Sequence, residues 1–304
     1  MSAELLEKKV APAAANKRKR SGKEQFWLIF RYVSLTFIWF LIVMPIYVLV
    51  VNSLKGVKDV YLVNAFDLPK ALDFSAWPIA WSGGDYFSAF SLGESMLRTL
   101  FFVLQSSIIS AIIGSINGYV FAKWKFPGSN IVFTLFLFGM FIPYQAVMIP
   151  LVQFVTNLGV NKSIYVLVMA HVIYGIPICT LIFRNYYASI PDELIEAGLV
   201  DKASRIRIYR SIILPLSLPA FVVVLIWQFT SAWNDFLFAI FLTGGSPKLS
   251  VATTALNFIT GSSNQVFYGL NMTASLIVSL PTLIVYIFLG RYFLRGLLSG
   301  SLKG

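Results

Sequence analysis

The residue best placed to do chemistry in the apolar part of this chain is Asp235, an acidic side chain among largely hydrocarbon neighbours. An ionised carboxylate at the centre of a bilayer costs about 2.5–3.5 kcal/mol on insertion scales, so it should face a cavity or a polar partner. The nearby polar and aromatic groups could line the same path for a polar solute. The candidate pathway residues are Tyr144, Gln145, Gln228, Trp233, Asn234 and Asp235. The alternative is that Asp235 only makes an interhelical hydrogen bond that holds a helix bundle together.

The sequence lacks the residue patterns of common catalytic and metal sites. His171 is the only histidine and Cys179 the only cysteine, and they stand about two helical turns apart. They cannot form a zinc site or a Cys/His catalytic pair. There is also no G-x-x-x-x-G-K-[ST] phosphate loop and no H-E-x-x-H motif. We therefore expect His171 to be a packed or pore-facing polar residue, and we expect a chain that is not an enzyme and binds no cofactor or metal itself.

Long apolar segments must position these residues. The chain of 304 residues is 58% hydrophobic and 12% charged, whereas a soluble domain carries about 25% charge. A helix needs about 20 apolar residues to cross a bilayer. The sequence thus predicts an all-α polytopic membrane protein whose six transmembrane helices lie at about 31–52, 97–122, 129–154, 163–184, 216–243 and 272–294. The predicted parts are a basic tail at 1–30, a membrane domain at 31–294 and a second tail at 295–304.

The positive charges indicate how the chain crosses the membrane. Most Lys and Arg residues fall in 1–31, 123–125, 184–210 and 291–303, and the exceptions are Lys55, Lys58, Lys70, Arg98, Lys162 and Lys248. By the positive-inside rule, this pattern predicts that both termini are cytoplasmic. The run of basic residues at 17–20 suits contact with anionic lipid headgroups. The net charge of +11 does not indicate a nucleic-acid partner, because no folded basic surface collects it.

Residues 189–219 form a charged stretch between apolar segments, with acidic residues first and arginines later. Lipid-spanning helices do not tolerate such charge density, so two short cytoplasmic helices are expected. Pro191 suits the first turn of one helix. In the second, Ile206, Tyr209 and Ile213 recur at helical spacing and should face inward, away from the arginines. Such a segment is typical of a docking surface for a cytoplasmic partner, although an ordinary solvated loop is the alternative.

This stretch resembles the EAA loop of ABC importer permeases, which fits into a cleft on the ATP-hydrolysing subunit. The resemblance implies a coupling loop at 189–215 with the coupling residues Glu196, Ala197, Gly198, Asp201, Ala203, Ile212, Leu214 and Pro215. Two positions depart from the motif. Gly198 replaces its second alanine, and Lys202 replaces the glycine that relaxes the turn between the helices.

Two further motifs are similar to the sugar-transporting branch of the same family. One is the turn from Phe121 to Gly128, and the other is the C-terminal run 291–304, whose glycines we expect to keep the tail irregular. The stretch from Trp233 to Phe236 also matches a pattern frequent in that branch. A ladder of small residues, Ser106, Ser110, Gly114 and Gly118, predicts close packing with a helix of this chain or of a second permease subunit.

The resemblance implies a type I ABC importer permease in a bacterial-type inner membrane, carrying a sugar or sugar-like solute. Its expected partners are a second, unlike permease subunit, a dimer of ATP-binding subunits that holds ATP and Mg²⁺, and an extracytoplasmic solute-binding protein. Alternating access would move the solute. The alternatives are an ATPase-independent secondary transporter or channel, and a membrane-embedded enzyme such as a glycosyltransferase. The sequence does not name the solute.

Overall fold

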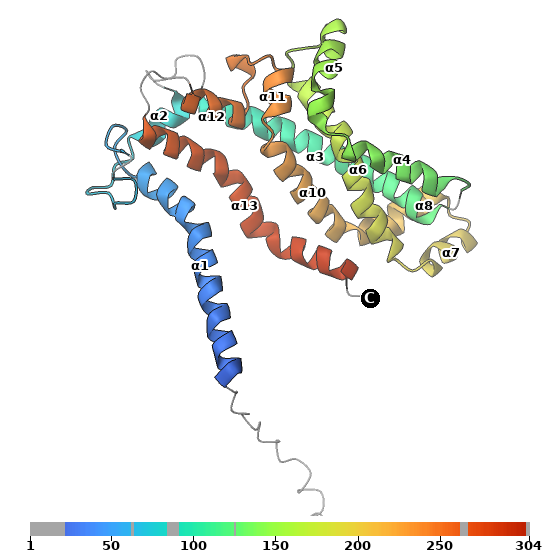
Figure 1. Ribbon diagram of the computed structural model, residues 1–304. Coiled ribbons are helices and arrows are strands. Elements are labelled where there is room, and N and C mark those ends of the chain that lie inside the picture. Colours follow the sequence, from blue (N-terminus) through green and yellow to red (C-terminus); the bar gives the residue numbers. More distant parts are fainter. Residues whose placement is uncertain (1–21, 62–63, 84–90, 125, 262–266, 302–304) are drawn as a thin grey trace, which may run out of the picture. The chain divides into compact units, whose positions relative to one another are not determined.

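The computed structural model describes residues 22–61, 64–83, 91–124, 126–261 and 267–301, and the regular elements in these ranges are all helices (Figure 1). The chain divides into two compact units, Met1–Val48 and Leu49–Gly304. The elements are α1 (Gly22–Ser53), α2 (Ala76–Ser82), α3 (Leu92–Lys123), α4 (Ser129–Phe141), α5 (Tyr144–Asn157), α6 (Ile164–Ala188), α7 (Glu193–Val200), α8 (Arg205–Ile208), the π-helix η5 (Tyr209–Ile213), α9 (Leu214–Leu216), α10 (Leu218–Trp233), α11 (Leu237–Leu242), the 3₁₀ helix η6 (Pro247–Leu249), α12 (Ala252–Gly261) and α13 (Tyr268–Ser301).

The first unit consists, in its described part, of most of α1. This helix begins at Gly22, so the end of the tail predicted at 1–30 is helical, whereas the basic run at 17–20 lies outside the described residues. No residue of its most apolar window is buried, and the helix is long enough to cross a bilayer. Side chains such as Phe26 and Trp39 lie open on its surface. A helix that is apolar and unburied in this way is typical of a membrane span.

The second unit is built around the contact between α3 and α6. The small-residue ladder faces α6, because a Cβ on Gly114 would lie 2.5 Å from Cβ of Cys179, and one on Gly118 would lie 2.6 Å from Cβ of Phe183. Glycine therefore lets the two backbones approach closely. This answers the question the sequence left open: the partner of the ladder is a helix of the same chain.

Two of the six predicted spans are interrupted. The span expected at 129–154 bends by 89° between α4 and α5, at Ile142 and Pro143. Proline has no backbone N–H to donate and clashes with the preceding turn, so a continuous helix breaks there. The span expected at 216–243 stops at Trp233 and resumes as α11 after Asn234–Phe236. Within the described residues, four helices are long enough to cross a membrane alone. The number rises to as many as six if two bent pairs each count as one span: Ser129–Phe141 with Tyr144–Asn157, and Arg205–Leu216 with Leu218–Trp233.

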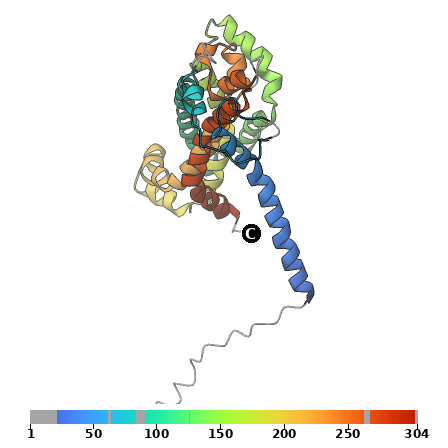
Figure 2. The ribbon, with the colours of Figure 1, turned by 90° about the vertical axis from the view of Figure 1, so that its left-hand side faces the viewer.

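The last helix, α13, runs from Tyr268 to Ser301. The expectation that glycines keep the C-terminal tail irregular is therefore wrong for residues 295–301, and residues 302–304 lie outside the described part. A single glycine costs about 1 kcal/mol in a helix, which a long apolar helix can absorb. In the second unit, α13 lies along α10, while α7 and α8 are set off to one side of the bundle (Figures 1 and 2).

Candidate functional site

The predicted coupling loop folds into two short helices joined by a tight turn. Helix α7 begins at Glu193, two residues after Pro191, so this proline precedes the helix instead of standing in its first turn. Ser204 caps α8, because its side chain accepts a hydrogen bond from the Arg207 N–H at 3.3 Å. A bend of 75° then separates the stretch Arg205–Leu216 from α10, which re-enters the bundle.

The second of these helices presents a face that the sequence did not predict. Ile206 was expected to point inward, but it is 62% exposed, and Ile208 is buried instead at 1%. The reason is η5, the π-helix that follows. A π-helix closes its hydrogen bonds over five residues, so Ile208 and Ile213 come onto the same face and both enter the core. An α-helix would place residues five apart on different faces.

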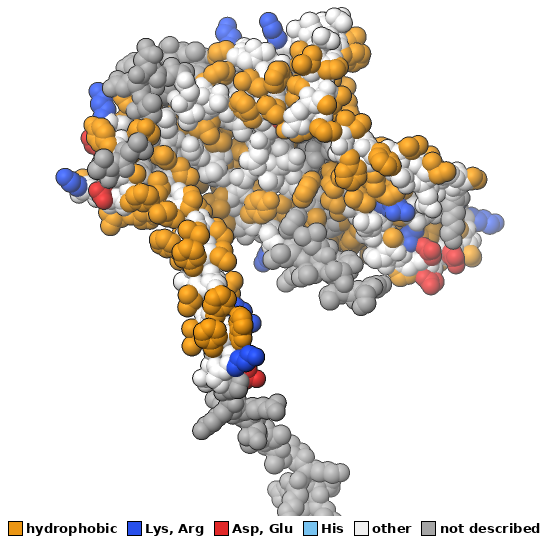
Figure 3. Space-filling model, viewed as in Figure 1, with side chains coloured by type: hydrophobic (Ala, Val, Ile, Leu, Met, Phe, Trp, Pro, Cys, Tyr) orange, Lys and Arg blue, Asp and Glu red, His pale blue; other side chains and the backbone are white. Residues whose placement is uncertain are grey.

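The outer surface of the loop mixes charge with exposed apolar side chains. Figure 3 shows acidic and basic side chains gathered at the end of the second unit where α7 and α8 lie. Of the predicted coupling residues, Glu196, Ala197, Asp201, Leu214 and Pro215 are exposed, whereas Gly198, Ala203 and Ile212 are half-buried. Leu194, Leu199, Val200 and Ile206 add exposed hydrophobic area. Exposed apolar groups rimmed by charge are typical of a protein interaction surface.

The turn between α7 and α8 has the geometry of a Schellman motif even though it lacks the usual glycine. The Ala203 N–H donates to the Gly198 carbonyl at 3.0 Å, and the Lys202 N–H donates to the Leu199 carbonyl at 3.0 Å. Lys202 itself adopts φ of +59°, the left-handed conformation that glycine usually supplies. The glycine at position 198 has a separate explanation, because a Cβ there would lie 3.0 Å from Cγ1 of Ile208. The motif's turn geometry is thus retained with a lysine at its strained position.

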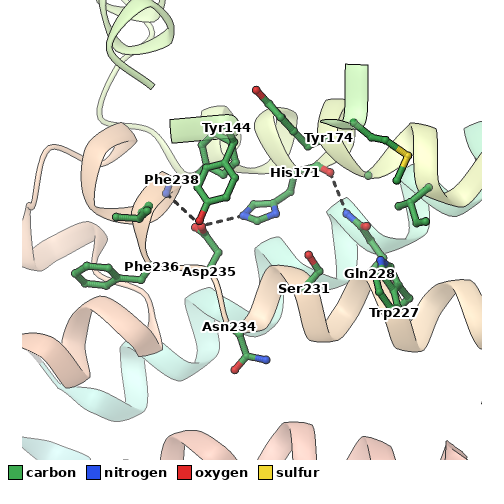
Figure 4. A pocket seen from close by; sticks show the side chains of 14 residues that line it. Tyr144, His171, Tyr174, Trp227, Gln228, Ser231, Asn234, Asp235, Phe236 and Phe238 are labelled. Carbon is green, nitrogen blue, oxygen red and sulfur yellow. Dashed lines mark hydrogen bonds and ion pairs between the residues drawn. The ribbon is translucent and has the colours of Figure 1, made fainter. Parts of the chain in front are cut away.

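A cavity of about 420 Å³ lies among α5, α6, α10 and α11, where the two interrupted spans meet (Figure 4). Its walls carry the aromatic rings of Tyr144, Tyr174, Trp227 and Phe238, together with neutral polar groups from α10. The full lining is Met140, Tyr144, His171, Tyr174, Gly175, Ile178, Trp227, Gln228, Ser231, Asn234, Asp235, Phe236, Leu237 and Phe238.

Asp235 stands at the break before α11, and its carboxylate is engaged by the protein. The Phe238 N–H donates to Oδ1 at 3.2 Å and the Ala239 N–H donates to Oδ2 at 2.9 Å, so the side chain caps the first turn of α11. Nε2 of His171 lies 3.4 Å from Oδ2, and both side chains are 7% exposed (Figure 4). The carboxylate therefore has a structural role at the break, but its hydrogen bonds lie within its own segment and are not the interhelical hydrogen bond that the sequence offered as the alternative.

Helix α6 also positions the side-chain amide of Gln228 in the cavity. Nε2 of Gln228 donates to the His171 carbonyl at 2.9 Å. This amide packs over Gly175, where any side chain would collide with it. The ring of His171 lies against Phe238 at 5.6 Å between centroids. His171 thus connects α6 to both α10 and α11, which fits the expectation of a packed or pore-facing polar residue.

The structure brings together four of the six predicted pathway residues: Tyr144, Gln228, Asn234 and Asp235 line the cavity. Gln145 is exposed and does not line it. Trp233 is 2% exposed and donates from Nε1 to the Val278 carbonyl at 3.0 Å, so it faces α13. The sequence did not single out Tyr174 or Trp227. The helical spacing of Tyr174 from His171, and of Trp227 from Ser231, could have indicated them.

Comparison with known proteins gives the family. The model of the "binding-protein-dependent transport system inner membrane component" family matches residues 110–298, which is more than half of the chain. The xylose/arabinose import permease protein XacI of Haloferax volcanii is 37% identical over 234 residues, covering 71% of this chain and 76% of that relative. The osmoprotective compounds uptake permease protein GgtD of Synechocystis is 31% identical over 309 residues, covering 95% of this chain and 99% of that relative.

A solved structure shares the fold. A bacterial ABC transporter involved in the import of the acidic polysaccharide alginate contains a chain with a TM-score of 0.76 and 21% identity, covering 91% of this chain and all of that chain. Residues 110–298 include the coupling loop, the cavity residues and most of α13. The chain therefore belongs to the family of binding-protein-dependent transport system inner membrane components, the membrane-embedded permeases of ABC importers, and is not itself an ATP-hydrolysing enzyme.

Proposed function

We propose that this permease imports a neutral sugar or sugar-like polyol that an extracytoplasmic binding protein delivers. A separate subunit supplies the energy, and it is that subunit which holds ATP and Mg²⁺. The loop from α7 to α9 receives this subunit through Glu196, Ala197, Gly198, Asp201, Ala203, Ile212, Leu214 and Pro215. Movement of the loop then alternates access to the cavity between the two sides of the membrane.

The observation that carries the proposal is the folded but exposed surface of α7 and α8. The loop is anchored in the core by three buried side chains, Ile195, Ile208 and Ile213, so its outer face is held in one shape. Val200, 80% exposed, stands out from this face beside the charged residues. Leu194, Leu199 and Ile206 are exposed in the same loop, and a group of exposed apolar side chains rimmed by charge is typical of a surface that another protein covers.

The cavity lining supports a neutral, hydroxyl-rich solute. Aromatic rings can stack on the apolar face of a sugar, and amide and hydroxyl groups can bond its hydroxyls. Tyr144, Gln228 and Asn234 provide those groups. The carboxylate of Asp235 is already satisfied by two backbone N–H groups and faces His171, so it offers little to a cationic solute. Xylose, arabinose and osmoprotective compounds appear in the names of relatives and are reasonable first solutes to test.

The assembly that we propose contains a second, unlike permease subunit and a dimer of ATP-binding subunits in the inner membrane. The distribution of Lys and Arg supports two cytoplasmic termini, because the basic segments 123–125 and 184–210 then share that side with both ends of the chain. The negatively charged lipid surface of the same side attracts the basic N-terminal segment.

The test is uptake by proteoliposomes that contain this chain, its partner permease, the ATP-binding subunits and the binding protein. Labelled xylose, arabinose and a neutral disaccharide form the panel, with glucuronate as the charged comparison. We expect ATP-dependent uptake of at least one neutral sugar and little uptake of glucuronate. Equal uptake without the ATP-binding subunits, driven by an ion gradient, would establish a secondary transporter instead. Uptake of glucuronate alone would overturn the proposed solute class.

A further inference from the structure

We infer that α3 is the element that transmits movement of the coupling loop to the cavity, and that Lys123 is the positioning residue that attaches the loop to it. This inference rests on the proposed function, because it assumes that α7 and α8 receive an ATP-hydrolysing partner. It concerns contacts at both ends of one helix, which the EAA-like motif itself does not include.

The cytoplasmic end of α3 is attached to the start of α7. Nζ of Lys123 donates to the Ile190 carbonyl at 2.5 Å and to Oδ1 of Asp192 at 2.6 Å. The Lys123 side chain is only 4% exposed, whereas that of Asp192 is 61% exposed. An ammonium group buried to this degree is costly unless it is paired, so the loop and the end of α3 are tied together.

The same end of α3 also holds the start of α8. The Arg205 guanidinium lies 5.0 Å from the centroid of a Trp124 ring, and the Tyr119 hydroxyl donates to the Arg205 carbonyl at 3.2 Å. One turn further into the bundle, Ser115 bonds the hydroxyl of Tyr209 at 2.8 Å. Both helices of the coupling loop are thus attached to α3, and a displacement of either one acts on the same helix.

The body of α3 is suited to carrying such a displacement. From Thr99 to Lys123 the helix is about 36 Å long at 1.5 Å per residue. It contains no proline, unlike the spans that break around the cavity. Gly114 and Gly118 set its backbone directly against α6, which limits bending between the two ends. A rigid element of this kind transmits motion instead of absorbing it.

The outer end of α3 holds the segment that leads to the cavity break. Oγ1 of Thr99 accepts from the Ala252 N–H at 2.7 Å, and Oγ of Ser95 lies 2.8 Å from Oγ of Ser250. The hydroxyl of Thr253, the residue after Ala252, donates to the backbone carbonyl of Asp235. A continuous set of contacts therefore leads from the coupling loop, along α3, to the break that Asp235 caps.

The test compares Lys123→Met with Lys58→Met in the complete reconstituted complex. The control substitution makes the same change at an exposed lysine of the outer loop. We expect Lys123→Met to assemble and to hydrolyse ATP, while sugar imported per ATP falls about tenfold, within the usual range of coupling between sites. Lys58→Met should keep the wild-type ratio. A wild-type ratio in assembled Lys123→Met complexes would overturn the inference.

Two further variants keep the test decisive if Lys123→Met does not assemble. Asp192→Asn and Trp124→Leu each remove one contact between the loop and α3, and each should lower the same ratio in assembled complexes. Combining Asp192→Asn with Lys123→Met should add little, because both changes act on one contact. Unchanged ratios in all assembled variants would overturn the inference.

A matched pair of variants tests the outer end of α3. Thr99→Val removes the acceptor for Ala252, whereas Thr134→Val, on exposed α4, removes a hydroxyl that bonds only the Asn130 carbonyl of its own helix among the described contacts. The first should lower sugar imported per ATP and the second should not. Failure of the proposed function would look different, since the wild-type complex would then show no ATP hydrolysis stimulated by the binding protein.

Discussion

Replacing Asp235 tests whether its carboxylate holds the cavity together or binds the solute. Hydrogen bonds to a charged acceptor contribute about 1.5–3 kcal/mol each, and loss of a helix cap costs about 0.5–2 kcal/mol. Asp235→Ala removes the acceptor for two N–H groups, one at 2.9 Å and a weaker one at 3.2 Å. We therefore expect a loss of about 2–3 kcal/mol in the free energy of unfolding, because cavity water can replace part of the bonding. Asp235→Asn keeps one oxygen and should lose about 1–2 kcal/mol.

The assay combines thermal unfolding of the purified complex with the KM and maximal rate of uptake. The thermal midpoint should fall in the order wild type, Asp235→Asn, Asp235→Ala, with maximal uptake falling alongside it. Asn234→Ala is the comparison, because its amide bonds only the Thr230 carbonyl of its own helix among the described contacts and lines the cavity. It should raise KM and leave the midpoint unchanged. Full stability with a raised KM in Asp235→Ala would refute the structural role.

Three other substitutions test separate features. Lys202→Gly should raise the free energy of unfolding by up to about 1 kcal/mol, since glycine relieves the strain at φ of +59°; a lower thermal midpoint would contradict this. Gly118→Ala should destabilise by about 1–3 kcal/mol through collision with Phe183, while the open control Gly139→Ala should stabilise slightly, and equal midpoints would argue against close packing of α3 on α6. Glu196→Lys should abolish uptake while the chain still inserts, as judged by membrane fractionation; normal ATP-coupled uptake would refute the docking role.

The parts of the fold that follow from length and hydropathy could be predicted from the sequence. Helices α3 and α6 need only a long apolar run and a polar cap at Ser91 and Ser163. The two helices of the charged loop were predicted from its charge density and from the spacing of its residues. The bends could not be predicted in the same way, because membrane helices accept many prolines without breaking. Pro177 stays inside α6, whereas the chain breaks at Pro143.

The candidate site also has features that the sequence predicts and features that it does not. Asp235 was found because its charge is out of place in an apolar segment, and Asn234 and Gln228 lie near it on the chain. Trp233 points to α13 and Trp227 to the cavity, a difference that depends on which helix packs against each face of α10. His171 faces Asp235 from another helix. Pairings between distant segments are decided by tertiary packing, which a single sequence does not reveal.

The π-helix at Tyr209–Ile213 holds one residue more than an α-helical turn would. Deleting one residue from it would leave Ile208 and Ile213 four positions apart, a spacing that an ordinary α-helix also places on one face, so both side chains would stay in the core. An insertion is different, because each added residue rotates everything after it by about 100°. Ile213, now fully buried, would leave the core, and α10 would present a different face to α6 and the cavity. The coupling loop therefore accepts one deletion at this turn and no insertion, unlike an ordinary surface loop, which accepts both.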